Sequence, residues 1–166
     1  VIQPAAAIGQ PPSDALILFD GSDINKEGED TQGQPTKWTV ENGELISVRG
    51  AGMIQTKRDF NDFQLHVEWK TPSNVSGTSQ GRGNSGVYLR GLYEIQVMDS
   101  YKRELDPHNM GAVYSRIKPV TAAEKPAGQW QSMDMTLCDR HITVLLNGIK
   151  IIDNQPVFGP TGGAMQ

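Results

Sequence analysis

The sequence predicts an all-β domain, a sandwich or barrel of short antiparallel strands. Short runs in which apolar and polar residues alternate recur about every 8–12 residues, as they do in such domains. Gly, Pro, Asn and Asp residues separate these runs, and two of the junctions are the dipeptide Asn-Gly. The residue spacing of amphipathic helices is nearly absent, which disfavours a helical or α/β domain.

Composition narrows the class of protein. A single domain of 166 residues buries roughly 70% of its unfolded surface, so it can form a core without metals or disulfides. No apolar run approaches the ~20 residues of a membrane-spanning helix, so membrane insertion is not expected. The net charge of −4 comes from scattered residues and leaves no basic patch for a phosphate backbone, so nucleic acid is not an expected partner.

Two segments are expected along the chain. Residues 1–15 contain Pro and Ala clusters without alternation and are predicted to be a disordered lead-in. Residues 16–166 are predicted to form a single β-sandwich domain. The chain begins at Val1 without an initiator Met, which is compatible with earlier removal of a leader peptide.

The first predicted hairpin covers residues 38–48 and turns at Asn42-Gly43. This dipeptide favours a type I′ turn because both central residues need a positive φ. The next predicted strand, residues 63–70, alternates without a break. One of its faces therefore belongs to the core, and the other, made of Gln64, His66, Glu68 and Lys70, faces water.

A Gly- and Ser-rich loop, residues 71–83, leads to a second hairpin with strands predicted over residues 86–90 and 94–98. If residues 91–93 form its loop, Arg90 faces Glu94 and Tyr88 faces Gln96 across the two strands. The apolar residues between them then share the opposite, core-facing side: Val87, Leu89, Ile95 and Val97.

The last strands are predicted over residues 130–137, 141–146 and 149–153, with a turn at Asn147-Gly148 between the last two. Residues 102–128 have mixed polarity and several Pro and Gly breakers, so they are predicted to form a long loop with a short strand at residues 112–115. Loops of this length are often functional.

The second hairpin carries more polar and aromatic side chains than solubility requires. The guanidinium of Arg90, the amide of Gln96 and the ring of Tyr88 match the hydroxyls and apolar C–H faces of a pyranose. The sequence therefore predicts a polar groove that binds a sugar or glycoside, with Asn84 and Asp99 as further binding residues. The alternative is a solvated sheet face with an Arg90–Glu94 ion pair worth under about 1 kcal/mol.

Glu94 and Glu68 are the best candidates for a general base, because both lie mid-strand on predicted polar faces where neighbours can raise a carboxylate pKa. His66 shares the water-facing side with Glu68, and a surface role is favoured for it over a binding role. His108 lies in the long loop, where a functional role and a bystander role are equally compatible with the sequence.

Ligand spacing gives no metal site. The three His residues are scattered and Cys138 is the single cysteine, so neither a structural zinc site nor an intrachain disulfide is expected. Binding of a divalent cation through oxygen ligands remains an alternative, and the sequence indicates no other cofactor. Cys138 is predicted to be a buried structural thiol. Trp130 is the best stacking platform among the three tryptophans, although a core role is favoured for all of them.

Six blocks, read in order, resemble the 3-keto-disaccharide hydrolase domain family over about residues 16 to 164. The most specific are Asn-Ser-Gly-Val-Tyr-Leu-Arg at 84–90 and Tyr-Glu-Ile-Gln-Val-Met-Asp at 93–99, and the others lie at 18–21, 38–43, 63–69 and 146–149. The resemblance implies a two-sheet antiparallel jelly-roll sandwich of the concanavalin A-like type. It also implies a bacterial protein that is secreted or periplasmic and cleaves glycosides whose sugar carries a ketone at carbon 3.

That activity assigns roles to the candidate residues. A ketone at carbon 3 acidifies the hydrogen on carbon 2, so a base can remove it while the glycosidic oxygen leaves carbon 1, and water then adds. On this hypothesis Glu94 or Glu68 is the base and Arg90 stabilises the enolate. The sugar is positioned by Tyr88, Gln96 and Asn84, and His108 is a reserve acid.

Relatives usually continue past a Gly-Pro-Thr-Gly-Gly segment, here residues 159–163, into a further pair of strands. This chain stops at Gln166, so we expect either a shortened chain or a domain whose last strands are missing, which would leave an exposed sheet edge and an incomplete groove. The oligomeric state and the natural glycoside do not follow from the sequence.

Two other functions remain as alternatives. The run from Glu94 to Asp99 is similar to the Glu-Ile-Asp-x-x-Glu strand of retaining β-glucanases, but Gln96 replaces the middle Asp and Asp99 replaces the last Glu. A mechanism with two carboxyl groups about 5–5.5 Å apart is therefore disfavoured. A non-catalytic carbohydrate-binding module is the stronger alternative, because a sandwich fold alone does not establish chemistry.

Overall fold

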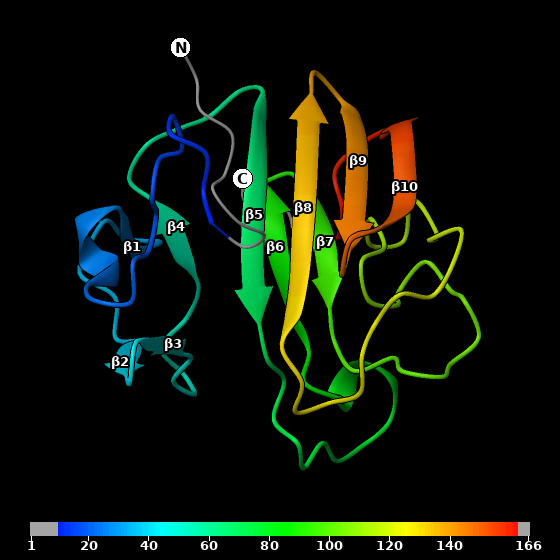
Figure 1. Cartoon of the computed structure of the whole chain (residues 1–166), viewed down its shortest axis with the longest axis horizontal. Coiled ribbons are helices and arrows are strands. Elements are labelled where there is room, and N and C mark those ends of the chain that lie inside the picture. The colour runs from blue at the N-terminus through cyan, green and yellow to red at the C-terminus, as the bar shows by residue number, and fades with distance from the viewer. Residues whose placement is uncertain (1–9, 163–166) are drawn as a thin grey trace. The chain divides into compact units, whose positions relative to one another are not determined.

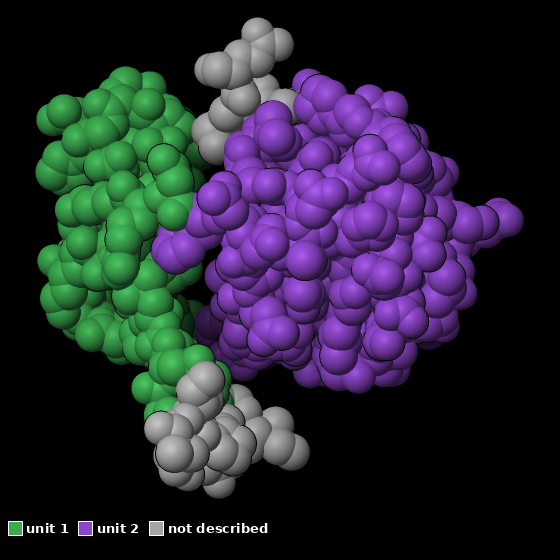
Figure 2. All heavy atoms as spheres, turned by 90° about the horizontal axis from the view of Figure 1, so that it is seen from above, with its two compact units in different colours: residues 1–59 green, residues 60–166 purple. Residues whose placement is uncertain are grey.

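The computed structural model describes residues 10–162. The chain divides into two compact units, residues 1–59 and residues 60–166, which Figure 2 colours separately and which are described one at a time. All paired strands among the described residues are antiparallel, and their helical segments are two three-residue 3-10 helices, which confirms the all-β prediction. No described helix is long and apolar enough to cross a membrane. The predicted lead-in lies mostly outside the described residues, and the single-domain boundary stays a prediction.

The first unit contains two small two-stranded sheets. In one, β1 (Gly28–Asp30), which follows the 3-10 helix η1 (Ile24–Lys26), pairs with β4 (Ile54–Thr56). In the other, β2 (Thr39–Glu41) pairs with β3 (Glu44–Ile46). Asn42 and Gly43 connect them with φ of 52° and 80°, so the predicted hairpin is confirmed. Strands β1 and β4 are three residues long, too short to produce a recognisable alternation.

The second unit contains a four-stranded sheet in the order β10-β9-β8-β5 (Figure 1). Its strands are β5 (Phe63–Trp69), β8 (Gln131–Cys138), β9 (His141–Leu146) and β10 (Ile149–Pro156). These confirm the strands predicted in this region, although β10 is longer than expected because two register shifts let it continue past residue 153. Burial alternates along β8 and β9, so one face of the sheet is packed and the other meets solvent.

A second sheet consists of β6 (Ser85–Leu89) and β7 (Tyr93–Val97), drawn behind the first in Figure 1. Leu89 and Ile95 belong to the same core as the buried side chains of β8, β9 and β10, so both sheets of this unit pack on a shared interior. The core-facing residues of the hairpin are therefore those that alternation predicted. Their neighbours in sequence, including Tyr88 and Glu94, point away from the core.

The outer edge of β7 is paired by part of the long loop. The N–H of Gln96 donates to the carbonyl of Ala112 over 2.9 Å, and the N–H of Tyr114 donates to the carbonyl of Glu94 over 2.9 Å. Ile95 and Val113 form an isolated antiparallel bridge between these bonds. The long loop is thus confirmed, and the short strand predicted at residues 112–115 is reduced to this bridge.

The predicted register of the β6–β7 hairpin is wrong. Tyr88 pairs with Glu94, and Gln96 pairs with Gly86, because the loop consists of residues 90–92 rather than 91–93. Arg90 and Gly91 both have positive φ, 53° and 66°, and they form the turn, so β6 ends at Leu89. Arg90 consequently lies in the loop and does not face Glu94.

The prediction of a buried thiol is also wrong. Cys138 is exposed at the end of β8, because the alternation of this strand directs Leu137 inward and its neighbour outward. The Cys138 Sγ lies 3.6 Å from Asp62 Oδ2. The carboxylate of Asp62 raises the pKa of the Cys138 thiol, since it disfavours a thiolate beside it.

Candidate active site

Three polar side chains from three adjacent segments form a row on the outer face of the β6–β7 sheet. Tyr88 and Glu94 are directly paired across the hairpin, and the Tyr88 hydroxyl donates to Glu94 Oε2 over 2.9 Å. The bridge between Ile95 and Val113 places Tyr114 beside Glu94 on the other edge of β7. Because paired residues in antiparallel segments point to the same face, the row runs from Tyr88 through Glu94 to Tyr114.

The backbone of Glu94 is held on both sides. Its carbonyl accepts from the N–H of Tyr114, and its N–H donates to Thr161 Oγ1 over 3.0 Å. Thr161 is 3% exposed, and its own N–H and hydroxyl both donate to the carbonyl of Leu92. These hydrogen bonds fix the position of the Glu94 backbone, from which the carboxylate extends.

The contact with Glu94 changes the acidity of Tyr88. Burial, the hydrogen bond to Glu94 and the negative charge of Glu94 raise the pKa of Tyr88 to about 12. The phenol therefore stays protonated at neutral pH and remains a donor to the carboxylate. Glu94 Oε2 is occupied by this donor, which leaves Oε1 as the oxygen available for other chemistry.

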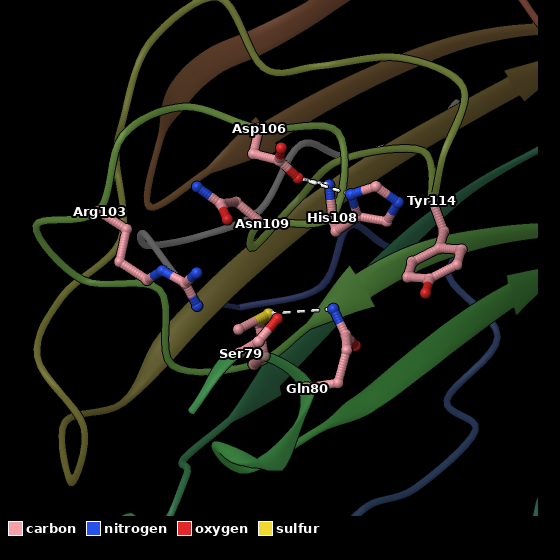
Figure 3. Close-up of a pocket in the computed structure, with 8 residues that line it drawn as sticks. Ser79, Gln80, Arg103, Asp106, His108, Asn109 and Tyr114 are labelled. Carbon is pink, nitrogen blue, oxygen red and sulfur yellow. Dashed lines mark hydrogen bonds and ion pairs between the residues drawn. The ribbon is translucent and has the colours of Figure 1, made fainter. Parts of the chain in front are cut away.

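A pocket of about 330 Å³ lies next to this row, within the size range of small-ligand sites. Tyr114 belongs to both the row and the pocket wall, and Figure 3 shows its ring beside His108, with Arg103 across the pocket. Ser79 and Gln80 from the 3-10 helix η2 (Ser79–Gly81), Met98 directly after β7, and the long loop supply the remaining walls. The lining residues are Ser79, Gln80, Met98, Arg103, Asp106, His108, Asn109 and Tyr114.

His108 is held on both ring nitrogens. Its Nδ1 lies 2.6 Å from Asp106 Oδ1, and its Nε2 lies 2.9 Å from Ser115 Oγ. The Tyr114 ring contacts it edge to face, with centroids 5.0 Å apart. The hydrogen bonds from His108 lower the pKa of Asp106, so this carboxylate is ionised and orients the imidazole.

The Asp106–His108–Ser115 chain resembles the arrangement that activates a serine nucleophile. The N–H groups of Ser115, Arg116 and Ile117 are, however, all bonded to carbonyls of the chain. They form no oxyanion hole beside Ser115, which acyl transfer would need. We therefore interpret the hydrogen bonds among Asp106, His108 and Ser115 as contacts that position the imidazole.

Gln96 lies on the same face as Glu94 but does not line an open groove. It is 0% exposed, and its Nε2 donates to Gln80 Oε1 over 2.7 Å. The Gln80 amide in turn lies in the pocket wall, with its Nε2 near the weak acceptor Met98 Sδ at 3.8 Å. Gln96 thus orients Gln80, and Gln80 is the amide that can reach a ligand.

Arg90 and Asp99 are engaged elsewhere. The Arg90 guanidinium donates to the carbonyl of Asp139. Its Cζ lies over the Tyr93 ring, 5.9 Å from the ring centroid. Asp99 is 8% exposed and forms an ion pair with Arg82. The structure therefore does not bring these two predicted residues into the row with Tyr88 and Glu94.

Glu68 and His66 lie on the other layer of the unit. They are exposed on β5, on the side opposite the core-packed Leu65 and Val67, and His66 contacts Asp134 at 2.7 Å. Because Glu94 points away from the same core on the second sheet, the two glutamates face opposite sides and cannot share one site. Asn84 is exposed just before β6. Trp130 is 45% exposed with the Lys70 ammonium 4.9 Å from its ring centroid, so one ring face is covered.

The sequence did not identify Tyr114, Gln80, Arg103 or Asp106 as site residues. All four come from loops or from η2, where no alternation indicates which way a side chain points. The pattern Asp106-Pro-His108 was a usable clue, because an Asp side chain commonly bonds the backbone two residues on, as it does here at 2.8 Å. Within residues 10–162, no group of three His, Cys, Asp or Glu side chains is arranged to hold a metal ion.

Comparison with known proteins identifies relatives. A family model described as a 3-keto-alpha-glucoside-1,2-lyase-like domain matches residues 14–165. A crystal structure of a provisionally assigned glycosyl hydrolase from Parabacteroides distasonis is similar at 35% identity, with a TM-score of 0.88, over 97% of this chain and 75% of that one. A second such protein from the same organism is 22% identical with a TM-score of 0.65, over 82% of this chain and 70% of that one, and it supports the fold alone. No curated protein sequence matches significantly.

Proposed function

The chain belongs to the 3-keto-alpha-glucoside-1,2-lyase-like domain family, and on this premise we propose that it cleaves 3-keto-glycosides by elimination across carbons 1 and 2 of the sugar. The observation that carries the proposal is the row of Tyr88, Glu94 and Tyr114 leading to His108. It connects an oriented carboxylate to an oriented imidazole through Tyr114, which pairs with Glu94, contacts His108 and lines the pocket. Elimination needs a base and an acid so arranged.

Glu94 is the base in this mechanism. Its Oε1 takes the proton from carbon 2, which the ketone at carbon 3 makes acidic, and the C–H electron pair moves into an enolate on carbons 2 and 3. The enolate then re-forms the ketone and the electrons of the C1–O bond leave with the glycosidic oxygen. The Tyr88 hydroxyl keeps the carboxylate oriented without titrating, since the pKa of Tyr88 is raised to about 12.

His108 is the proton donor to the leaving oxygen. Asp106 and Ser115 fix its ring at Nδ1 and Nε2. In this proposal Ser115 Oγ accepts the proton from Nε2 while its own hydroxyl proton goes to the departing alcohol. Water then adds at carbon 1 of the unsaturated 3-ketone and a proton returns to carbon 2. The sum of both steps is hydrolysis, with both catalytic groups restored.

The pocket supplies charge and hydrogen bonds to the sugar. Arg103, the cation in the pocket wall, takes the enolate-stabilising role that the sequence suggested for Arg90. The amide of Gln80 and the ring of Tyr114 match a sugar hydroxyl and an apolar sugar face. Two finer predictions stay proposals: the jelly-roll connectivity of the two packed sheets, and export of the protein to the periplasm or medium.

Deuterium labelling at carbon 2 of the sugar tests whether the protein cleaves 3-keto-glycosides by elimination. The protein is incubated with a 3-keto-glucoside, the parent glucoside and a β-glucan, in D2O and with substrate deuterated at carbon 2. We expect turnover of the 3-keto-glucoside alone, a primary isotope effect and deuterium at carbon 2 of the product above an enzyme-free control. Turnover of the β-glucan would instead support a glucanase, and binding without turnover would support a lectin-like module.

Variants separate the two glutamates. Replacing Glu94 by Gln removes the base and keeps the shape, so turnover should fall by about 10²-fold or more. The matched control is Glu68→Gln, an exposed glutamate on the other sheet, which should leave turnover unchanged. Equal activity of the Glu94→Gln variant and the wild-type protein would contradict the proposed mechanism.

A further inference from the structure

The Glu94 side chain occupies a space that exists only because residue 86 is glycine. A Cβ on Gly86 would lie 2.8 Å from Glu94 Cγ and 3.0 Å from Glu94 Cδ, and closer still to Oε1. Real Cβ atoms essentially never approach heavy atoms below 3.0 Å. Gly86 precedes Tyr88 by two residues on β6, so both point to the outer face on which Glu94 lies.

Backbone conformation does not explain the glycine. Gly86 lies inside a regular strand and is not among the residues with positive φ, so an alanine could adopt its conformation. Glycine also weakens a strand, since it loses more conformational freedom on folding and packs no side chain. The absence of a Cβ at residue 86 therefore needs an explanation. The three heavy atoms nearest to the position of that Cβ all belong to the Glu94 side chain.

We propose that Gly86 is a positioning residue for Glu94: its bare backbone and the Tyr88 hydroxyl clamp the carboxylate from two sides, with Oε1 against Gly86 and Oε2 on Tyr88. This inference rests on the proposed function for its catalytic meaning, and on the geometry alone for the placement of the carboxylate. Thr161 and Tyr114 hold the Glu94 backbone, so we expect a Cβ at residue 86 to be accommodated by rotation of the Glu94 side chain.

The test is Gly86→Ala. The clashing atoms, Cγ, Cδ and Oε1, all belong to the flexible Glu94 side chain and none to the backbone, so the fold should survive while the carboxylate moves. A displacement of about 1 Å in a catalytic group costs about 10²-fold in rate, so kcat should fall by that order while KM changes little. In the Glu94→Gln background the same substitution should have almost no further effect, because the group that it displaces is no longer a base.

Gly81→Ala is the matched control. Gly81 lies in η2, it also lacks a positive φ, and a Cβ there would have no heavy atom within 4 Å. It tests whether loss of a glycine near the site is harmful in itself. Urea unfolding of both alanine variants shows that each remains folded.

A measurement without substrate makes the inference independent of the proposed reaction. With 13C-labelled tyrosine rings, assigned by comparison with Tyr88→Phe, NMR follows the ionisation of Tyr88. Gly86→Ala should break the Tyr88–Glu94 hydrogen bond and lower the Tyr88 pKa, whereas Gly81→Ala should leave it in place. If the wild-type protein turns over no 3-keto-glucoside but Gly86→Ala lowers the Tyr88 pKa, the proposed function fails and the positioning role stands. Wild-type kcat together with an unchanged Tyr88 pKa in Gly86→Ala would overturn the inference.

Discussion

Tyr88 and Glu94 face each other across the β6–β7 hairpin and are joined by a hydrogen bond of 2.9 Å from the phenol to the carboxylate. The Tyr88 hydroxyl stays protonated at neutral pH, and its hydrogen bond fixes the orientation of the Glu94 carboxylate. The pair lies on the outer face of its sheet and is independent of the packed core on the other side.

Replacing Tyr88 by Phe should lower kcat by on the order of tenfold, because a hydrogen bond to a charged group is worth about 1.5 kcal/mol or more. The fold should persist, since the ring remains and the hydroxyl is not part of the core. Steady-state kinetics on a 3-keto-glucoside measure the loss. A Tyr88→Phe variant that is fully active would remove the hydroxyl from the mechanism.

The same tyrosine should make stability depend on pH in the alkaline range. Its folded-state pKa of about 12 lies above the ordinary value of 10.0, so the unfolded chain loses this proton first as pH rises. The stabilising contribution is therefore complete below about pH 10 and is lost between about pH 10 and pH 12. Urea unfolding across this window should show a smaller decline for Tyr88→Phe than for the wild-type protein, and identical slopes would contradict the assignment.

His108 should matter most when the leaving group is poor. A general acid contributes about 10²-fold or more to departure of an alkoxide and far less to departure of a nitrophenolate. The variant His108→Gln should therefore lose about 100-fold with an alkyl aglycone and under about tenfold with a 4-nitrophenyl aglycone. Equal losses with both substrates would show that His108 acts in binding rather than as the acid.

Asn147 should be the most sensitive turn residue of the four-stranded sheet. Its side chain accepts from the N–H of Ser132 and donates to the carbonyl of Ala123 and to Gln131 Oε1, while its φ is 51°. Asn147→Gly loses these bonds but tolerates the conformation, and should cost about 2 kcal/mol. Asn147→Ala adds backbone strain and should cost about 3 kcal/mol. Chemical denaturation measures both, and a glycine variant as stable as the wild-type protein would refute the role of the amide.

Removal of the charge on Asp62 should activate Cys138. The carboxylate raises the pKa of this exposed thiol, so Asp62→Asn should lower that pKa and increase the thiolate fraction at neutral pH. The rate of alkylation by iodoacetamide should rise accordingly. Asp153→Asn, which changes a distant exposed carboxylate on β10, serves as the control. Equal rates in all three proteins would mean that Asp62 does not govern the thiol.

Alternation made most strands predictable, and it also explains the error in the β6–β7 hairpin. A register shifted by two residues keeps every side chain on its face, so Tyr88, Glu94 and Gln96 were placed on the correct side while their partners were exchanged. The position of the loop decides the partners, and both Arg90 and Gly91 had to adopt positive φ to fix it. A non-glycine residue such as Arg90 gives no warning of this in the sequence.

The sequence located the site mainly where strands carry it. Glu94 and Tyr88 follow from the alternation, and His108 was named as a candidate only from its place in the long loop, without a preferred role. Tyr114 and Gln80 were not named, because they reach the site through loop geometry. The Asp99–Arg82 ion pair likewise joins two residues outside the strands, and it engages a carboxylate that the pattern alone had offered for binding. Loop contacts of this kind depend on the whole fold and not on local sequence.

The site is built from two parts of the chain, the strand β7 and the loop segment that pairs irregularly with its outer edge. Glu94 is carried by a strand whose position the core dictates, while Tyr114 and His108 belong to a loop segment that joins that strand through one isolated bridge and the backbone hydrogen bonds around it. Changes in the long loop therefore alter the walls of the pocket and the surroundings of His108, while the strand that carries Glu94 stays held by the core. Sequence changes can thus act on the two parts of the site separately.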